Sequence, residues 1–176
     1  PDGRSGERRA NLQQAGTEIR ALDLSPDHRT LATANEDGSV RLWDLGSGRE
    51  FAQLGGGMPL MAIRFSPDGS ALASAGTDGR VRLWDVATRN ERASPGGHDA
   101  AVRALAFSPD GNALASASAD RTVRVWNLTD GGKPAGLAGH GDAVDDVAFD
   151  PSGRTLASTG RDGTLRLWDL ASAKEL

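Results

Sequence analysis

The chain contains four tryptophans, and they recur at an almost constant interval. Trp43, Trp84, Trp126 and Trp168 are separated by 41, 42 and 42 residues, and they lie in near-identical sequences: VRLWDL, VRLWDV, VRVWNL and LRLWDL. A fixed period of about 40 residues predicts an array of similar supersecondary units. Arrays of this kind typically act through their surfaces, so the repeat favours binding over catalysis.

The third copy shows what one unit is built from. Val102–Phe107 is a short apolar run that ends at residues 108–111, Ser-Pro-Asp-Gly, where each residue type favours a turn. A second small apolar run, Ala113–Ala117, precedes Thr122–Trp126, which alternates between two faces. A more variable outer strand ends near Leu137. We therefore predict four short antiparallel strands per unit and almost no helix.

The pattern GH…LxFSPDG…LASxxxDGxVRLWD resembles the WD40 repeat family over about residues 12–176. The resemblance implies an all-β fold, a WD40 β-propeller region with four four-stranded antiparallel blades around a central channel. It divides the single region 1–176 into five segments: an outer strand of a preceding or closing blade at 1–16, then repeats at 17–54, 55–96, 97–138 and 139–176, the last with a truncated outer strand.

The resemblance also implies a hydrogen-bonded tetrad in each blade. Its members are the repeat tryptophan, a His before the first strand, a Ser or Thr on the second strand and the Asp of the following turn. Copies three and four hold complete sets: His98, Ser116, Asp120 and Trp126, and His140, Ser158, Asp162 and Trp168. Copies one and two hold partial sets: Thr33, Asp37 and Trp43, and Ser74, Asp78 and Trp84.

Ala15 and Gly56 stand where copies one and two would carry the His. We expect water or a backbone donor to replace the missing imidazole, because a buried carboxylate without a partner is costly. We also expect blades one and two to open more easily than blades three and four, a difference that hydrogen exchange measures.

In the same family, partners commonly dock on the face that carries the His-containing connection and the turn between the second and third strands. The residues three and five after the His, and the residue before the tetrad Asp, often make the contacts. Transferred by alignment, the candidate partner-binding residues are Glu18, Arg20, Glu36, Pro59, Met61, Thr77, Arg103, Asp145 and Arg161. Met61 is the one apolar anchor among them, and three acids and three arginines make the rest a mixed rim.

Other chemistries find little support. Ser, His and Asp occur together, but no GxSxG elbow accompanies them, so a structural role is the better interpretation than a hydrolytic triad. The three histidines lack zinc-ligand spacing, and no phosphate-binding glycine loop is present, so we expect no catalytic residues, metal or cofactor.

The net charge of −4 argues against nucleic acid as a partner, and no apolar run approaches the roughly 20 residues of a membrane span. The absence of cysteine fits a cytoplasmic location.

Four blades fill about half of an eight-bladed ring. One interpretation is that the chain, which begins at Pro1, is a piece of a longer array; the other is that it closes by itself or pairs with a second copy.

Eighteen arginines against two lysines suggest a GC-rich bacterial gene. We expect a non-catalytic scaffold that binds a protein or peptide, as the sensor region of a larger signalling protein. Two alternatives stay open: an enzyme or effector with its active site outside this segment, and a structural oligomerisation module.

Overall fold

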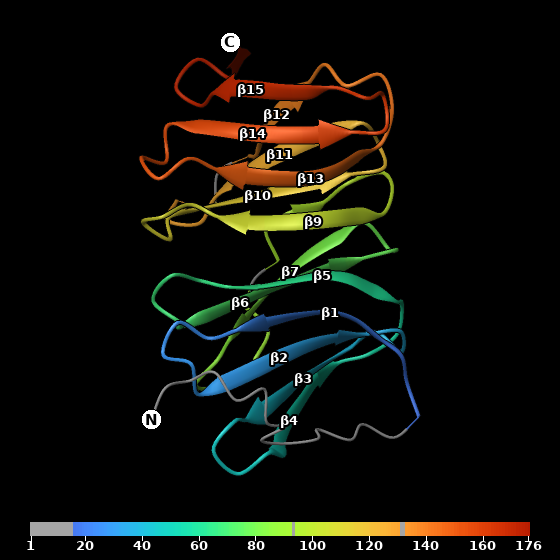
Figure 1. The fold of residues 1–176 in the computed structure, drawn as a ribbon, viewed down its shortest axis with the longest axis vertical. Helices are drawn as coiled ribbons and strands as arrows, with labels where there is room; N and C mark the ends of the chain where they lie inside the picture. Colours follow the sequence, from blue (N-terminus) through green and yellow to red (C-terminus); the bar gives the residue numbers. More distant parts are fainter. Residues whose placement is uncertain (1–15, 93, 131–132) are drawn as a thin grey trace, which may run out of the picture.

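The computed structural model describes residues 16–92, 94–130 and 133–176, which form sixteen β-strands in four antiparallel sheets (Figure 1). Each sheet contains four strands that are consecutive in the chain and pair in sequence order. No helix occurs in these described residues. The all-β fold with four four-stranded units is therefore confirmed, and we refer to the sheets as blades 1 to 4.

The strand bounds repeat closely from blade to blade. Blade 1 comprises β1 (Ile19–Leu24), β2 (Thr30–Asn35), β3 (Ser39–Asp44) and β4 (Arg49–Gly55). Blade 2 comprises β5 (Leu60–Phe65), β6 (Ala71–Gly76), β7 (Arg80–Asp85) and β8 (Gly96–Gly97). Blade 3 comprises β9 (Val102–Phe107), β10 (Ala113–Ser118), β11 (Thr122–Asn127) and β12 (Ala135–Ala138). Blade 4 comprises β13 (Val144–Phe149), β14 (Thr155–Gly160), β15 (Leu165–Asp169) and β16 (Lys174–Glu175).

The turn between the first and second strands of each blade is fixed by a side chain. In blade 3, Asp110 Oδ1 accepts hydrogen bonds from Ser108 Oγ at 2.6 Å and from the Asn112 backbone N–H at 3.0 Å. Gly111 has φ +74°, a conformation that glycine adopts without strain. In blade 1, His28 occupies the equivalent position with φ +57°, so this turn carries backbone strain that the others avoid.

Each blade has one face with bulky side chains and one face on which the second strand carries small ones. In blade 2, Leu72 and Trp84 face blade 1, whereas Ala73 and Ala75 face blade 3 and receive its bulky residues, Trp126 among them. The alternation of strand side chains places these two sets on opposite sides of one sheet. Neighbouring blades thus interlock large against small, which explains the small apolar LAS segments in the sequence.

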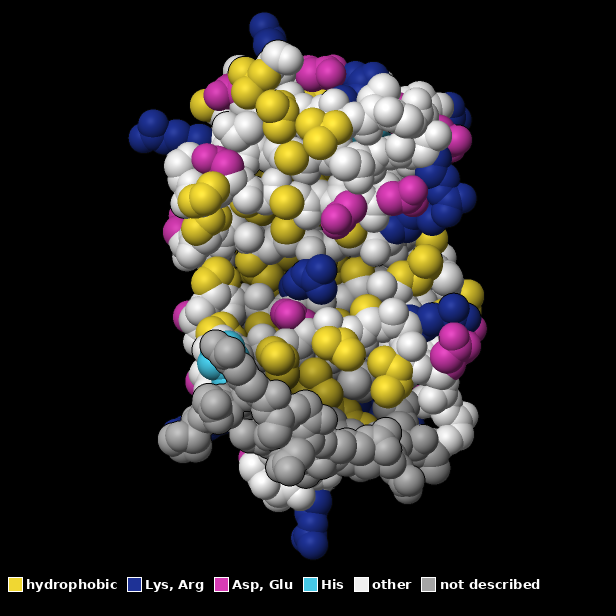
Figure 2. Space-filling view, viewed as in Figure 1, with side chains coloured by type: hydrophobic (Ala, Val, Ile, Leu, Met, Phe, Trp, Pro, Cys, Tyr) yellow, Lys and Arg dark blue, Asp and Glu magenta, His cyan; other side chains and the backbone are white. Residues whose placement is uncertain are grey.

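The array is an open arc whose two end blades lie at opposite ends of the molecule (Figure 1). At the free side of blade 1, Leu22 is 57% exposed, whereas Ile63 at the same position of blade 2 is fully buried. At the free side of blade 4, Leu165 is 65% exposed, whereas its blade 1 equivalent, Val40, is fully buried. On the face formed by β1, β5, β9 and β13, hydrophobic side chains are visible over both end blades (Figure 2).

The outer strands vary most, as the sequence predicts. β4 extends over seven residues, whereas β8 and β16 have two each. The additional outer strand predicted at residues 1–16 falls on positions 1–15, which lie outside the described residues, and on Gly16.

Candidate functional site

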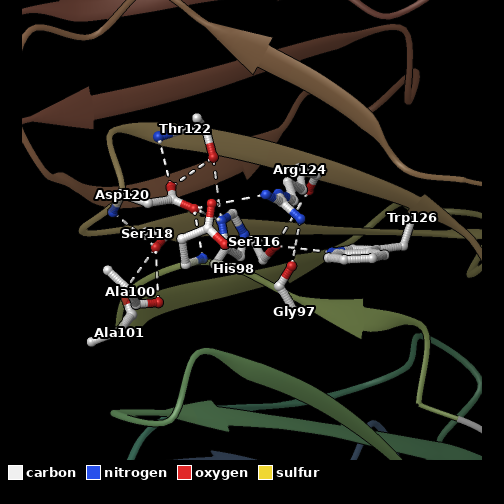
Figure 3. A network of polar contacts seen from close by, with 11 residues as sticks. Gly97, His98, Ala100, Ala101, Ser116, Ser118, Asp120, Thr122, Arg124 and Trp126 are labelled. Atoms are coloured by element: carbon white, nitrogen blue, oxygen red, sulfur yellow. Dashed lines mark hydrogen bonds and ion pairs between the residues drawn. The ribbon is translucent and has the colours of Figure 1, made fainter.

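The tetrad of blade 3 joins four chain segments through one line of hydrogen bonds (Figure 3). The Trp126 indole Nε1–H donates to Ser116 Oγ at 2.9 Å. Ser116 Oγ lies 2.8 Å from His98 Nε2, and His98 Nδ1 lies 2.8 Å from Asp120 Oδ2. The line therefore ties the outer-to-inner connection before β9 to strands β10 and β11 and to the turn between them.

This geometry assigns the proton on each group. Asp120 is an acceptor when ionised, so His98 donates from Nδ1, and its Nε2 accepts the Ser116 hydroxyl proton. Burial alone would raise the pKa of Asp120, but hydrogen bonds from Thr122 and His98 outweigh it and lower the pKa to about 2. Burial lowers the pKa of His98 below 6.5, although the neighbouring Asp120 opposes that shift. A neutral imidazole beside an ionised carboxylate is the state that satisfies both groups.

The neutral His98 predicts acid sensitivity of the fold. A histidine with a lowered folded pKa takes up its proton more readily when unfolded, so stability is complete above pH 6.5 and declines as the pH falls below that value. We expect the ring-carbon NMR shifts of His98 to titrate below pH 6.5. Titration at or above pH 6.5 would show that the imidazolium is the folded form.

Blade 4 repeats the arrangement. Trp168 Nε1–H donates to Ser158 Oγ at 2.8 Å, Ser158 Oγ lies 2.8 Å from His140 Nε2, and His140 Nδ1 lies 3.0 Å from Asp162 Oδ2. The Gly141 backbone N–H also donates to Asp162 Oδ2 at 2.8 Å. Although burial opposes the change, hydrogen bonds from Thr164 and the Gly141 backbone lower the pKa of Asp162.

Blades 1 and 2 keep the tryptophan-to-hydroxyl bond. Where the histidine is missing, an arginine that the sequence analysis did not predict pairs with the tetrad Asp. Trp84 Nε1–H donates to Ser74 Oγ at 2.8 Å, and Trp43 Nε1–H reaches Thr33 Oγ1 at 3.4 Å. The carboxylates of Asp78 and Asp37 each pair with the arginine four residues later, Arg82 and Arg41. Backbone donors, which the sequence analysis expects here, also contact these carboxylates: Ser39 N–H donates to Asp37 Oδ1 at 2.9 Å, and Arg80 N–H donates to Asp78 Oδ1 at 3.0 Å.

The signal for this substitution was present in the sequence. Every copy carries an arginine two residues before its tryptophan, in the segment VRLW or its variants: Arg41, Arg82, Arg124 and Arg166. In blade 3, where the histidine is present, the Arg124 guanidinium stands 4.0 Å from Asp120 and donates from Nη1 to the Gly97 carbonyl. In blades 1 and 4 the arginine also pairs with an outer-strand glutamate, Glu50 or Glu175, so the partners of this arginine vary from blade to blade.

The tetrads are unsuited to chemistry on a substrate. Ser116 is fully buried and Ser158 is 1% exposed, so neither hydroxyl is accessible to an incoming molecule. A hydrolytic nucleophile must be exposed at a site where a reacting atom fits beside it. Within the described residues, no group of three or more His, Cys, Asp or Glu side chains is arranged to hold a metal ion. No helix in the described part of the chain is long and apolar enough to cross a membrane.

The candidate partner-binding residues lie at the tetrad end of the blades, which we call the tetrad face. In each blade, the backbone N–H of the residue before the tetrad Asp donates to the carbonyl of the residue that precedes the first strand. These bonds join Glu36 to Glu18, Thr77 to Pro59, Ala119 to Ala101 and Arg161 to Ala143, at 2.8–2.9 Å. The candidate positions therefore meet in pairs on one face, although the sequence separates them by 18 residues.

The charged candidates on the tetrad face form two separate groups. In blade 1, Arg20 Nε lies 2.7 Å from Glu36 and Nη2 lies 3.6 Å from Glu18. Between blades 3 and 4, Asp145 Oδ1 lies 3.1 Å from Arg103 and 3.3 Å from Arg161. The first group contains one more acid than base, and the second contains one more base than acid.

Blade 2 places apolar side chains between these charged groups. Met61 on β5 is 37% exposed, and Met58, in the connection just before it, is 57% exposed. The alignment to the family pattern predicts Met61 and Pro59 as contact residues. It does not include Met58, because it covers only three positions in each repeat. The sequence feature that could have identified Met58 is a second methionine in a polar, glycine-rich connection.

Comparison with known proteins agrees with this architecture. The family model described as "WD domain, G-beta repeat" matches residues 6–44, 52–85, 90–127 and 132–169. The solved structure of U3-55K is similar to the chain, with a TM-score of 0.85 and 28% sequence identity over 94% of this chain. The match covers 53% of U3-55K, so the chain spans about half the length of that protein. The four repeats, their tetrads and their blade topology place this chain in the WD40 repeat family.

Proposed function

We propose that the chain is a non-catalytic scaffold that binds a protein or peptide on the tetrad face. WD40 propellers typically serve as protein-interaction scaffolds. The observation that carries the proposal for this chain is the exposed pair Met58 and Met61, placed between an acidic and a basic group of side chains. Methionine adapts to the shape of a partner, and a central apolar contact with a polar rim is typical of protein interfaces.

The wider setting of the scaffold is also part of this proposal. We infer that it acts as the sensor or interaction region of a larger bacterial signalling protein, in a cytoplasmic location, without a cofactor and without nucleic acid as a partner. The arginine-rich, cysteine-free composition and the net charge of −4 support this setting.

We further propose that both free sides of the array are covered by additional blades, either of the same protein or of a second copy. Leu22 and Leu24 at one side, and Leu165 and Leu167 at the other, are more than a third exposed. Their equivalents in the inner blades pack into the hydrophobic clusters. Light scattering on the purified chain tests the pairing of two copies: a stable dimer supports it, and a compact monomer at every concentration contradicts it.

Site-specific photo-crosslinking tests the tetrad face directly. A crosslinking amino acid at Met61 should capture the partner in the native source, whereas the same group at Leu45 should not. Leu45 is also 37% exposed, but it lies in the turn after β3, at the opposite end of the blade. Capture of the same partner from Leu45 alone would place the docking surface on the other face and refute the proposal.

A further inference from the structure

A groove of about 780 Å³ lies between blades 2 and 3, at the end of the blades opposite the tetrad face. Its inner wall is formed by Leu83, Phe107 and Leu128, and its mouth by the two Ser-Pro-Asp-Gly turns of these blades. A cleft of this size falls in the range of small-ligand and peptide sites, which combine an apolar floor with a few polar groups.

The outer strand beside the groove differs from those of blades 1 and 3. In blades 1 and 3, a leucine on the outer strand, Leu54 or Leu137, is buried in the cluster shared with the next blade. The register places Gly96 at this position in blade 2, opposite Val81. The Trp126 ring of blade 3 packs against Gly96 and takes the place of that side chain.

The outer strand of blade 2 pairs sparsely with β7. Among the described residues, the pairs are Gly96–Gly97 with β7 and an isolated bridge between Glu91 and Trp84. Gly96 has φ +134°, and a Cβ atom there would lie 2.8 Å from the Trp126 ring, so no larger residue fits. Ser94 and Pro95, which precede this short strand, line the groove.

The turns at the mouth of the groove carry shorter side chains than the equivalent turns elsewhere. The residue that follows the turn glycine, or its equivalent His28, is Ser70 in blade 2 and Asn112 in blade 3, and both line the groove. In blades 1 and 4 the same position holds a long arginine, Arg29 or Arg154. Short polar side chains thus occur at the two turns that border the groove.

The acidic side chains at the mouth of the groove favour a cationic ligand. Hydrogen bonds from Ser66 and the Ser70 backbone lower the pKa of Asp68 to about 2, and bonds from Ser108 and the Asn112 backbone lower the pKa of Asp110, so both are ionised. The one cationic lining residue, Arg92, is already paired with Asp85 at 2.7 Å. The Oδ2 atoms of both turn aspartates contact only exposed Ser70 and Asn112 side chains, which a ligand can displace.

We infer that this groove binds a peptide segment of a partner protein in which a basic side chain stands beside a large aliphatic one. The aliphatic side chain packs on Leu83, Phe107 and Leu128, and the basic side chain pairs with Asp68 and Asp110. This site is separate from the tetrad face, so one propeller region engages two partner segments at opposite ends of its blades.

NMR titration of the chain with two matched peptides tests this inference. Acetyl-Gly-Arg-Leu-Gly-amide should shift the backbone amides of residues 66–71, 108–112 and 128, and acetyl-Gly-Glu-Leu-Gly-amide should bind at least fivefold more weakly. The double substitution Asp68→Asn and Asp110→Asn should weaken the first peptide about fivefold, because asparagine keeps the turn but removes the charge.

Two controls separate the groove from the rest of the surface. Asn112→Trp should block the groove and abolish the shifts, whereas Arg29→Trp, the same position in blade 1, should leave them unchanged. Met61→Glu on the tetrad face should also leave them unchanged, which distinguishes this site from the proposed function. Equal binding of the two peptides, shifts at other residues, or no shifts at millimolar peptide would each overturn the inference.

Discussion

Replacing His98 by phenylalanine is expected to lower the free energy of unfolding by about 3 kcal/mol. Phenylalanine is somewhat larger than histidine, so no cavity forms and the loss reflects the missing hydrogen bonds together with overpacking. Ser116 loses its acceptor at 2.8 Å, and Asp120 loses its Nδ1–H donor at the same distance. Both groups keep other partners, so the cost is that of the two lost hydrogen bonds, about 1 kcal/mol for the neutral one and about 2 kcal/mol for the one to the carboxylate.

Urea unfolding monitored by tryptophan fluorescence measures this difference. The control is His28→Asn, which alters an exposed histidine at a turn with positive φ, a conformation that asparagine tolerates. It should change stability by less than about 0.5 kcal/mol. A loss below about 1 kcal/mol for His98→Phe would mean that the tetrad is not a stabilising network.

The second large effect concerns the interlocking of the blades. Leu42→Ala should cost about 3 kcal/mol, because Leu42 is fully buried against blade 2 in a cluster with Ile63 and Phe65. Leu167→Ala makes the same change at the same repeat position of blade 4, where the side chain is 43% exposed. In the monomeric chain it should cost less than about 1 kcal/mol.

This pair of variants reports on the open arc. The two measurements require a concentration at which light scattering gives the mass of one chain. If Leu167→Ala were as costly as Leu42→Ala under that condition, the end of blade 4 would be packed against another part of the same chain. The array would then be a closed ring and not the arc of Figure 1.

The repeat sequence predicted most of the fold because the same local rules act four times. Turns at Pro, Asp and Gly and strands with alternating faces specify each blade, and the apolar pattern specifies how blades interlock. The tetrad members of blades 3 and 4 followed from the family resemblance, and the structure brings each member within 3.0 Å of the next.

The remaining features depend on three-dimensional contacts that no local rule encodes. The pairing of Arg82 with Asp78 requires knowing that both side chains leave the same face of β7 and its turn. The groove between blades 2 and 3 requires knowing where Ser94 and Pro95 lie relative to the two turns, because the outer strands are too variable to align by sequence. The exposure of Met58 likewise follows from the path of a glycine-rich connection.

The proposed function requires that a partner docks on the tetrad face around Met61. Its most direct test is the affinity of the captured partner for two variants, Met61→Glu and Leu45→Glu, which place the same charge at equally exposed positions on opposite faces. Loss of a central apolar contact weakens an interface by about 2 kcal/mol or more, which corresponds to about 30-fold in Kd. Met61→Glu should show that loss, whereas Leu45→Glu should leave the Kd unchanged. An unchanged Kd for Met61→Glu, or an equal loss in both variants, would contradict it.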